Sequence, residues 1–192
     1  MDRNRRHFLF AAAAIVATGV APAIALAASA PVIQVPSEIG QFWEAPREIW
    51  LARSATGEQQ KVCYWRDGQI DIAGYSQACY MLRDTHINQS VQMDIGLLNL
   101  LRAIQGWLVY YNINHPIIVN SAYRSRQTNN KTEGAAKDSF HVKGMAVDIT
   151  IPGIPSQYLF KLAAAFSGGG LGFYPSKNFV HADTGRIRYW RG

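Results

Sequence analysis

Two histidines and one aspartate, in two separate stretches of the chain, have the residue types of a metal site. His141 and Asp148 lie seven residues apart, and His181 follows in the stretch 179–183. Two imidazoles and one carboxylate leave one position of a tetrahedral Zn²⁺ ion open, which is typical of catalytic rather than structural zinc sites. The sequence therefore predicts one zinc ion held by these three side chains, and a hydrolase as the leading class.

The chain between His141 and Asp148 must turn tightly if both side chains are to meet one ion. Gly144 permits such a turn because it has no Cβ to clash. In the strand predicted at 145–151, Ala146 and Asp148 share one face, and the small alanine leaves room for an ion. The remaining histidines beyond the leader, His86 and His115, are expected to be structural.

The elements that must carry these residues follow from periodicity and turn residues. Aromatic and β-branched runs at 47–52 and 61–65 predict a hairpin, and helices are expected from Ser76 to Leu82 and from Asp94 onward. Trp107 and Tyr111 extend the apolar stripe of the second helix and are expected in the core. Further strands are predicted at 117–120, at 145–151 and around Phe173, Val180 and Ile187. A helix is predicted at 156–166, and the stretch 121–140 is polar. This order predicts an α+β fold with a mainly antiparallel sheet and flanking helices.

Several motifs in a fixed order carry a resemblance to a known family. The pattern S-x-H-x-x-G-x-A-x-D at 139–148 is preceded by S-x-Y-R-S at 121–125 and followed by F-V-H-x-D at 179–183. This set resembles the LAS-type zinc peptidases, which include D-alanyl-D-alanine peptidases and hedgehog-like domains. The similarity is greatest to the periplasmic murein endopeptidase group. It extends from about residue 46 to 190 and includes 56–58 (TGE), 82–84 (LRD), 151–153 (IPG) and 169–174 (GGLGFY).

The resemblance implies a LAS fold and a role for each site residue. It implies that His141, Asp148 and His181 ligate Zn²⁺, and that Arg124 meets the substrate or the developing oxyanion. A guanidinium beside a tetrahedral intermediate stabilises charge that appears only in the transition state. A structural ion pair is the alternative for Arg124. Ser139 is expected to hold the substrate, to orient a ligand or to cap a turn.

The motifs do not identify which residue acts as the general base. Many relatives have a glutamate three residues before the last ligand, where this chain has Asn178, and others have a histidine two before it, where this chain has Phe179. Asp183, two residues beyond His181, lies on the same strand face. It is expected either to take a proton from the attacking water or to fix the imidazole of His181.

The first residues have the features of an export signal. Arg5 and Arg6 precede an Ala-rich apolar run that ends at an A-x-A site, residues 25–27. We expect a twin-arginine signal over 1–27, a linker or N-terminal arm over 28–45, and the zinc peptidase domain over 46–192. An uncleaved anchor is the alternative. The expected location is the periplasm, with no stable membrane span after cleavage.

The charge of the chain restricts the class of partner. The formal net charge is +6, of which about +4 remains without the leader. This modest surplus fits an anionic polymer such as peptidoglycan, whereas no basic run with interleaved aromatics indicates nucleic acid. A monomer is expected. The protein is expected to be exported, and it has two cysteines, Cys63 and Cys79. They are expected either to form a disulfide or to be separate, buried hydrophobic residues.

These observations give one leading hypothesis and two alternatives. The leading one is a zinc-dependent murein endopeptidase that hydrolyses amide bonds in cell-wall peptide cross-links. The first alternative is a non-catalytic peptidoglycan-binding module with the same fold, which the missing glutamate at position 178 favours. The second is a carboxypeptidase that removes a terminal D-alanine.

Overall fold

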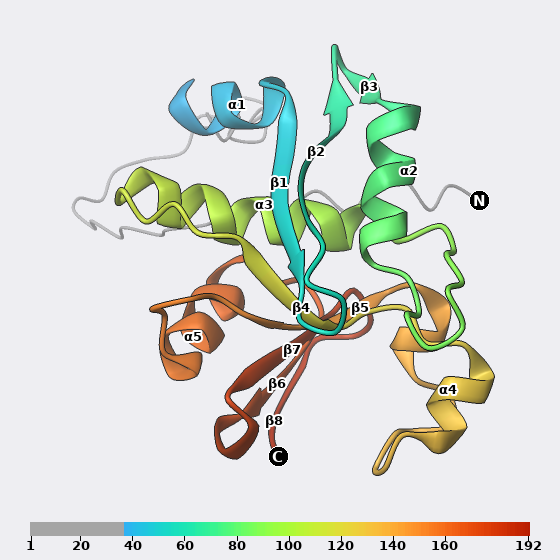
Figure 1. Ribbon diagram of the computed structural model, residues 1–192. Helices are drawn as coiled ribbons and strands as arrows, with labels where there is room; N and C mark the ends of the chain where they lie inside the picture. Colours follow the sequence, from blue (N-terminus) through green and yellow to red (C-terminus); the bar gives the residue numbers. More distant parts are fainter. Residues whose placement is uncertain (1–36) are drawn as a thin grey trace, which may run out of the picture.

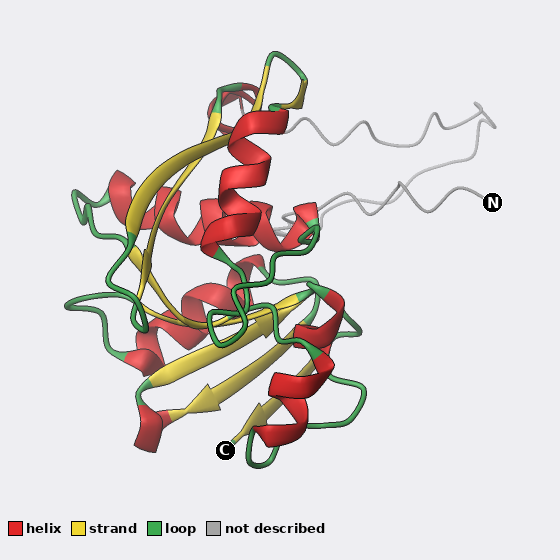
Figure 2. Cartoon of the chain, turned by 45° about the vertical axis from the view of Figure 1, so that its right-hand side comes forward, coloured by secondary structure: helices red, strands yellow, loops and turns green. Residues whose placement is uncertain are grey.

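The computed structural model describes residues 37–192, which form one curved sheet with helices on both sides (Figures 1 and 2). The predicted export signal, and residues 28–36 of the predicted linker, lie outside the described residues. The strands are β1 (Arg47–Arg53), β2 (Gln59–Arg66), β3 (Gln69–Ile70), β4 (Ile117–Ser121), β5 (Ala146–Thr150), β6 (Gly170–Tyr174), β7 (Phe179–Asp183) and β8 (Arg188–Arg191). The α-helices are α1 (Ser37–Glu44), α2 (Ile72–Met81), α3 (Ile95–Tyr110), α4 (Arg126–Lys131) and α5 (Ser156–Phe166), and 3₁₀ turns occupy Phe140–Lys143 (η1) and Pro175–Lys177 (η2).

The eight strands have the order β3-β2-β1-β4-β5-β7-β6-β8. The expectation of a mainly antiparallel sheet is wrong, because the sheet is mixed: β1 runs parallel to β4, and β6 runs parallel to β8. Parallel neighbours need a crossover connection rather than a hairpin. Helices α2 and α3 supply the crossover between β1 and β4, and β7 lies between β6 and β8 in the chain. Order of elements alone does not reveal such crossovers.

The core lies between the sheet and helices α3 and α5. Asp94 caps α3 as predicted, since its carboxylate accepts a hydrogen bond from the Leu97 amide at 3.2 Å. Alternation along β5 and β7 sends Val147, Ile149, Val180 and Ala182 into this core. Asp148 and His181 therefore point to the opposite face, where η1 and α4 pack (Figure 2).

Two local expectations are corrected, and a helix is found in the polar stretch. Helix α2 begins at Ile72, before Ser76, because Asp71 caps it by accepting from the Gly74 amide at 2.8 Å. The polar stretch 121–140 contains helix α4, capped by Ser125. Trp107 and Tyr111 are not in the core, since they are 40% and 53% exposed, whereas Ile104 and Leu108 form the buried face at this end of α3.

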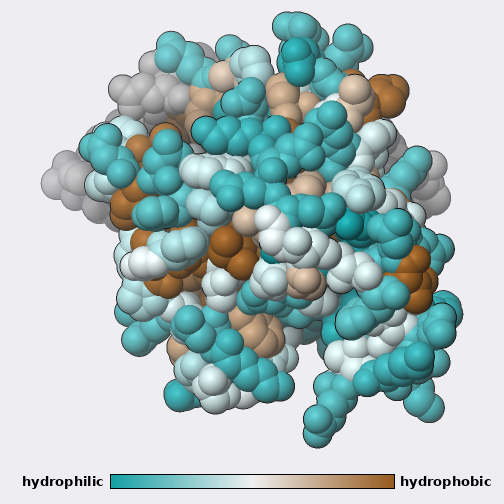
Figure 3. All heavy atoms as spheres, in the orientation of Figure 1, coloured by the Kyte–Doolittle hydropathy of each residue, from teal (hydrophilic) through white to brown (hydrophobic). Residues whose placement is uncertain are grey.

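Residues before the predicted boundary at 46 also contact the domain. In α1, the Phe42 carbonyl accepts a hydrogen bond from Arg102 of α3 at 2.9 Å. Cys63 and Cys79 are both free, and their sulfur atoms hydrogen-bond to different partners. Within residues 37–192, no helix has the length and apolar character needed to cross a membrane. Figure 3 shows a mostly hydrophilic face on which hydrophobic residues form separate small groups.

Candidate active site

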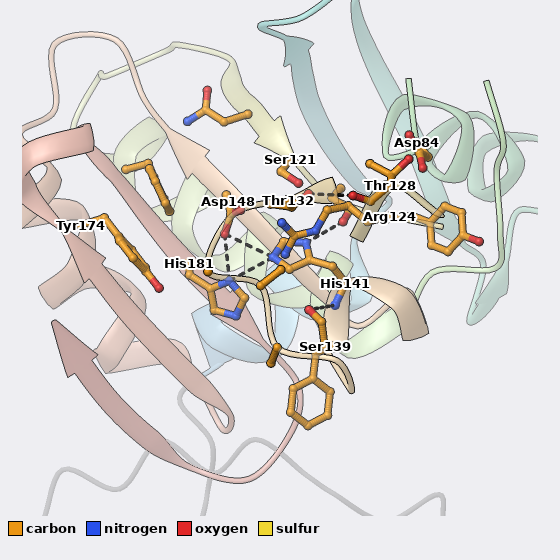
Figure 4. Close-up of a pocket in the computed structure, with 18 of the residues that line it drawn as sticks. Asp84, Ser121, Arg124, Thr128, Thr132, Ser139, His141, Asp148, Tyr174 and His181 are labelled. Atoms are coloured by element: carbon orange, nitrogen blue, oxygen red, sulfur yellow. Dashed lines mark hydrogen bonds and ion pairs between the residues drawn. The ribbon is translucent and has the colours of Figure 1, made fainter. Parts of the chain in front are cut away.

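Three ligand-type atoms of His141, Asp148 and His181 form a compact triangle (Figure 4). Asp148 Oδ1 lies 2.8 Å from His181 Nδ1 and 3.4 Å from His141 Nε2, and the two nitrogens are 3.2 Å apart. Ligands at about 2.0–2.1 Å from a tetrahedral zinc ion stand roughly 3.3 Å from one another. The size of the triangle and its donor set therefore fit a zinc ion.

Sheet register places two of these residues side by side. Asp148 of β5 pairs directly with His181 of β7 in the antiparallel ladder. His141 arrives from η1, which ends at Gly144 with a φ of 68°. A Cβ at Gly144 would stand 2.8 Å from the Gln92 carbonyl oxygen, so both the backbone conformation and the packing favour glycine here. The tight turn predicted from the sequence is present.

The second nitrogen of each imidazole is already engaged. His141 Nδ1 lies 2.6 Å from the Ala122 carbonyl oxygen, and His181 Nε2 lies 3.0 Å from Asp183 Oδ2. A carbonyl or carboxylate partner requires an N–H at that ring position. His141 Nε2 and His181 Nδ1 are therefore the ring nitrogens left to bind a metal, and both face Asp148. Such outer partners orient metal-binding histidines.

Asp183 lies beneath His181 and outside the cavity. Its side chain has no exposed surface, and its oxygens also accept from the Gly170 and Gly185 amides at 3.2 and 2.9 Å. Arg188 donates to both oxygens at 3.0 and 2.7 Å. Burial raises the pKa of Asp183, but the hydrogen bonds from His181, Arg188 and Gly185 lower it more, to well below its usual range.

The carboxylate of Asp148 is held in its charged form. Burial raises its pKa, but the imidazoles of His141 and His181 lower it further, to well below its usual range. Burial likewise lowers the pKa of His181, while Asp148 and Asp183 raise it more, so that it stands above the usual value. The cluster therefore has a charged carboxylate between two basic rings, and it is suited to a cation.

Arg124 lines the same cavity as the three ligand-type residues. Its amide donates to the His141 carbonyl oxygen at 3.2 Å, which ties its backbone to that of a ligand-type residue. Within residues 37–192, Arg124 has no ion pair within 4.0 Å, and its Nε is buried without a hydrogen-bond partner. Burial lowers the pKa of the guanidinium, and Asp148 and Tyr174 partly offset this. The structure gives no support to a structural ion pair.

The cavity has a volume of about 880 Å³ and includes both residues predicted for it and residues that sequence reasoning missed. Ser139 lies in its wall and caps η1, because its hydroxyl accepts from the His141 amide at 3.3 Å. His86, expected to be structural, also lines the cavity. Tyr174 and Trp190 were missed. The Tyr174 hydroxyl accepts from Trp190 Nε1 at 2.9 Å, and the Trp190 ring centre is 5.2 Å from that of His181.

The fold and the site define a candidate metal centre of the hydrolytic type, with three protein ligands at the wall of an open cleft. The chain belongs to the peptidoglycan L,D-endopeptidase MepK family, whose sequence pattern matches residues 42–190. This confirms the predicted membership in the murein endopeptidase group of the LAS-type peptidases.

Two curated relatives illustrate the extent of the similarity. The chain is 35% identical over 174 residues to the peptidoglycan L,D-endopeptidase MepK of Escherichia coli K12, which covers 86% of this chain and 91% of that protein. It is 31% identical over 202 residues to the probable peptidoglycan L,D-endopeptidase MepK of Haemophilus influenzae, which covers 100% of this chain and 98% of that protein. The comparison with solved structures found no match.

Proposed function

We propose that this protein is a zinc-dependent peptidoglycan endopeptidase that hydrolyses amide bonds in cell-wall peptide cross-links. The observation that carries the proposal is the triangle of three ligand atoms, with edges of 2.8 to 3.4 Å, at the wall of an open cavity. The names of the E. coli and H. influenzae relatives give the substrate class. Because such peptides lie outside the inner membrane, we infer a periplasmic location, with residues 1–27 as a twin-arginine export signal.

In this proposal His141, Asp148 and His181 hold one zinc ion. When bound, zinc supplies Lewis acidity, which polarises the amide carbonyl and makes water nucleophilic near neutral pH. Arg124 donates its guanidinium N–H groups to the oxygen on which negative charge develops. Its Nε already lacks a partner in the described part of the chain, so stabilising this charge costs no existing bond. Ser139 positions the peptide from the cavity wall.

For Asp183 we propose the orienting role. Its oxygens are occupied by His181, Arg188 and two backbone amides, and it does not line the cavity. A general base must lie within hydrogen-bond reach of the proton that it takes, directly or through one water. Holding His181 Nε2–H at 3.0 Å instead keeps His181 Nδ1 free for the metal.

The test is incubation of the purified protein with cross-linked muropeptides, with and without a chelator. The proposal expects chelator-sensitive loss of the cross-linked dimers, and recovery of activity on addition of zinc. Release of terminal D-alanine without loss of dimers would instead identify a carboxypeptidase. The substitution Asp148→Ala should remove both zinc and activity.

A non-catalytic peptidoglycan-binding module is the second candidate. It is favoured by Asn178 and Phe179, which occupy the positions where relatives have a basic or acidic catalytic side chain, and by the saturated hydrogen bonding of Asp183. A protein that holds one equivalent of zinc and sediments with purified peptidoglycan, but releases no product, would establish this candidate and exclude the enzyme.

A further inference from the structure

Arg53, the last residue of β1, is a buried arginine in the wall of the cavity. Arg53 is only 4% exposed. It lies at the end of a strand and is not part of a packed polar network. Arginine is among the residue types least often buried without a partner. Packing in the core therefore does not explain why an arginine is buried at this position.

The guanidinium of Arg53 has almost no hydrogen bonds. Its Nε and Nη1 are buried without a partner among residues 37–192, and Nη2 reaches only the Thr85 hydroxyl, at 3.5 Å. Buried polar atoms of native proteins are nearly always satisfied, and exceptions are frequent at functional sites. The three N–H groups on Nε and Nη1 thus have no acceptor in the part of the chain that the structure describes.

The carboxylates near Arg53 are engaged by other groups. Glu58 accepts two hydrogen bonds from Arg83, at 3.0 and 2.8 Å. Asp84 accepts from the amides of Ser125 and His86, at 2.9 and 3.0 Å. Burial and the charge of Arg83 lower the pKa of Arg53, and Glu58 and Asp84 only partly offset this. No ion pair forms with Arg53 within the part of the chain that the structure describes.

A second buried arginine shows what a structural role looks like here. Arg83 is 5% exposed, and each of its nitrogens has a partner: Asn88, the Tyr80 carbonyl and Glu58. Arg53 has the same burial and lacks this network. The difference lies in its surroundings rather than in its burial, so a purely structural role does not account for Arg53.

Sheet geometry gives the distance from Arg53 to the candidate metal site. β1, β4 and β5 are consecutive strands, so the backbones of Arg53 and Asp148 are two strand spacings apart, ~10 Å across the sheet. Two or three residues of an extended peptide span about this length. In Figure 4, Asp84 and Tyr174 lie on opposite sides of His141, Asp148 and His181. One cavity includes both Arg53 and the candidate metal site.

We propose that Arg53 binds a free carboxylate of the peptide substrate, about two or three residues from the amide that is cleaved. This inference rests on the proposed function, because it takes the ligand to be an acidic peptide in the same cavity. A carboxylate matches the planar fork of a guanidinium and forms paired, charge-assisted hydrogen bonds with it. The carboxylate reaches Arg53 by displacing the Thr85 hydroxyl, whose bond to Nη2 is at the limit of hydrogen-bond length.

The test measures binding rather than turnover. The probes are cross-linked stem peptides in which a reduced, non-hydrolysable bond replaces the scissile amide, with each free carboxylate converted in turn to a carboxamide. Affinities are measured by calorimetry on the zinc-loaded full chain. We expect the wild type to bind the parent peptide at least tenfold more tightly than one of the carboxamides. Arg53→Gln should remove this preference by weakening binding of the parent alone.

Arg186→Gln is the matched control, because Arg186 is an exposed arginine of the same cavity and its loss changes the net charge equally. It should keep the preference. Arg53→Lys, which retains the charge without the planar fork, should reduce the preference without abolishing it. Zinc content and melting temperature should be unchanged in each variant. A wild type that binds all peptides equally, or an Arg53→Gln or Arg53→Lys variant that keeps the full preference, would overturn the proposal.

The proposed function and the carboxylate site can fail separately. A wild type that does not cleave the unmodified peptide, but prefers the carboxylate through Arg53, would exclude the endopeptidase and support the site. A wild type that cleaves normally without any carboxylate preference would support the endopeptidase and exclude the carboxylate site.

Discussion

The carboxylate of Asp183 lies 3.0 Å from Nε2 of His181, on the side of the imidazole that faces away from Asp148. Both residues are on β7, two positions apart, and so share one face of the sheet. Arg188 donates to Asp183 from the other side at 2.7 Å. A charged chain Arg188–Asp183–His181 thus sets which nitrogen of the imidazole is offered to a metal.

This relationship predicts a specific phenotype for Asp183→Asn. Loss of the carboxylate should weaken zinc binding by roughly 10–100-fold, because the imidazole loses its orienting acceptor. Activity should fall in parallel and recover when zinc is added in excess, as measured by metal titration and muropeptide cleavage. If zinc affinity is unchanged and activity is lost at saturating zinc, Asp183 is the general base after all.

Arg124→Ala should lower kcat with little change in KM or zinc content. The guanidinium is proposed to act on charge that exists only in the transition state, and loss of one such donor costs roughly 10²–10³ in kcat. Arg124→Lys should restore only part of the rate, since lysine lacks the planar fork. Steady-state kinetics with a defined muropeptide provide the measurement. A rise in KM with kcat unchanged would assign Arg124 to ground-state binding instead.

Zinc affinity should fall as the pH is lowered. Asp148 and Asp183 raise the pKa of His181 above its usual value in the metal-free protein, so protons compete with the metal from above pH ~6.5 downward. Apparent affinity should rise with pH through this raised pKa and then level off. Competition with a chromophoric chelator between pH 5.5 and 8.5 measures it. In Asp183→Asn the midpoint of the rise in zinc affinity with pH should move to lower pH. An unchanged midpoint would contradict the role of Asp183 in raising the pKa of His181.

Asp84→Ala should destabilise the fold near neutral pH. Asp84 accepts from the buried amide of Ser125 and from the more exposed amide of His86, and one buried unsatisfied donor costs roughly 1–3 kcal/mol of unfolding free energy. Although burial raises the pKa of Asp84, its hydrogen bonds lower it more. Its contribution is therefore complete above the unfolded pKa of about 3.9 and is lost as the pH falls through the lower folded value.

Urea unfolding at pH 7 and pH 2.5 checks this sign. The difference in unfolding free energy between the wild type and Asp84→Ala should be large at pH 7 and smaller at pH 2.5. Asp138→Ala is a suitable control, because Asp138 is exposed and, among residues 37–192, forms an ion pair with the exposed Lys143 alone. Its loss should change stability by no more than about 1 kcal/mol at pH 7.

Gly144→Ala should weaken both the fold and the zinc site. The φ of 68° is unfavourable for alanine, and its Cβ would press on the Gln92 carbonyl oxygen. We expect a loss of about 1–3 kcal/mol in unfolding free energy, together with weaker zinc binding, because η1 carries His141. Gly134→Ala shares the positive φ but has open space around the new Cβ, so it should cost less and leave zinc binding intact. Equal effects of both substitutions would contradict this explanation.

The family, the three ligand-type residues and the strands that carry Asp148 and His181 can be predicted without a structure. The cap at Asp94, the turn at Gly144 and the alternation around Asp148 depend on residues close in the chain. Such local preferences act before any tertiary contact forms, so they can be read from the sequence alone.

How the side chains are paired and buried depends on tertiary contacts and could not be predicted. Asp183 is placed outside the cavity by Gly170 of β6 and Arg188 of β8, which the mixed sheet brings to it. Trp107 is left exposed because it lies off the face of α3 on which Ile104 and Leu108 are buried. Among the described residues, Arg53 is left without an ion pair, and Glu58 pairs with Arg83 instead. Each outcome depends on which distant segments compete for the same acceptor or the same surface, and sequence spacing does not contain that information.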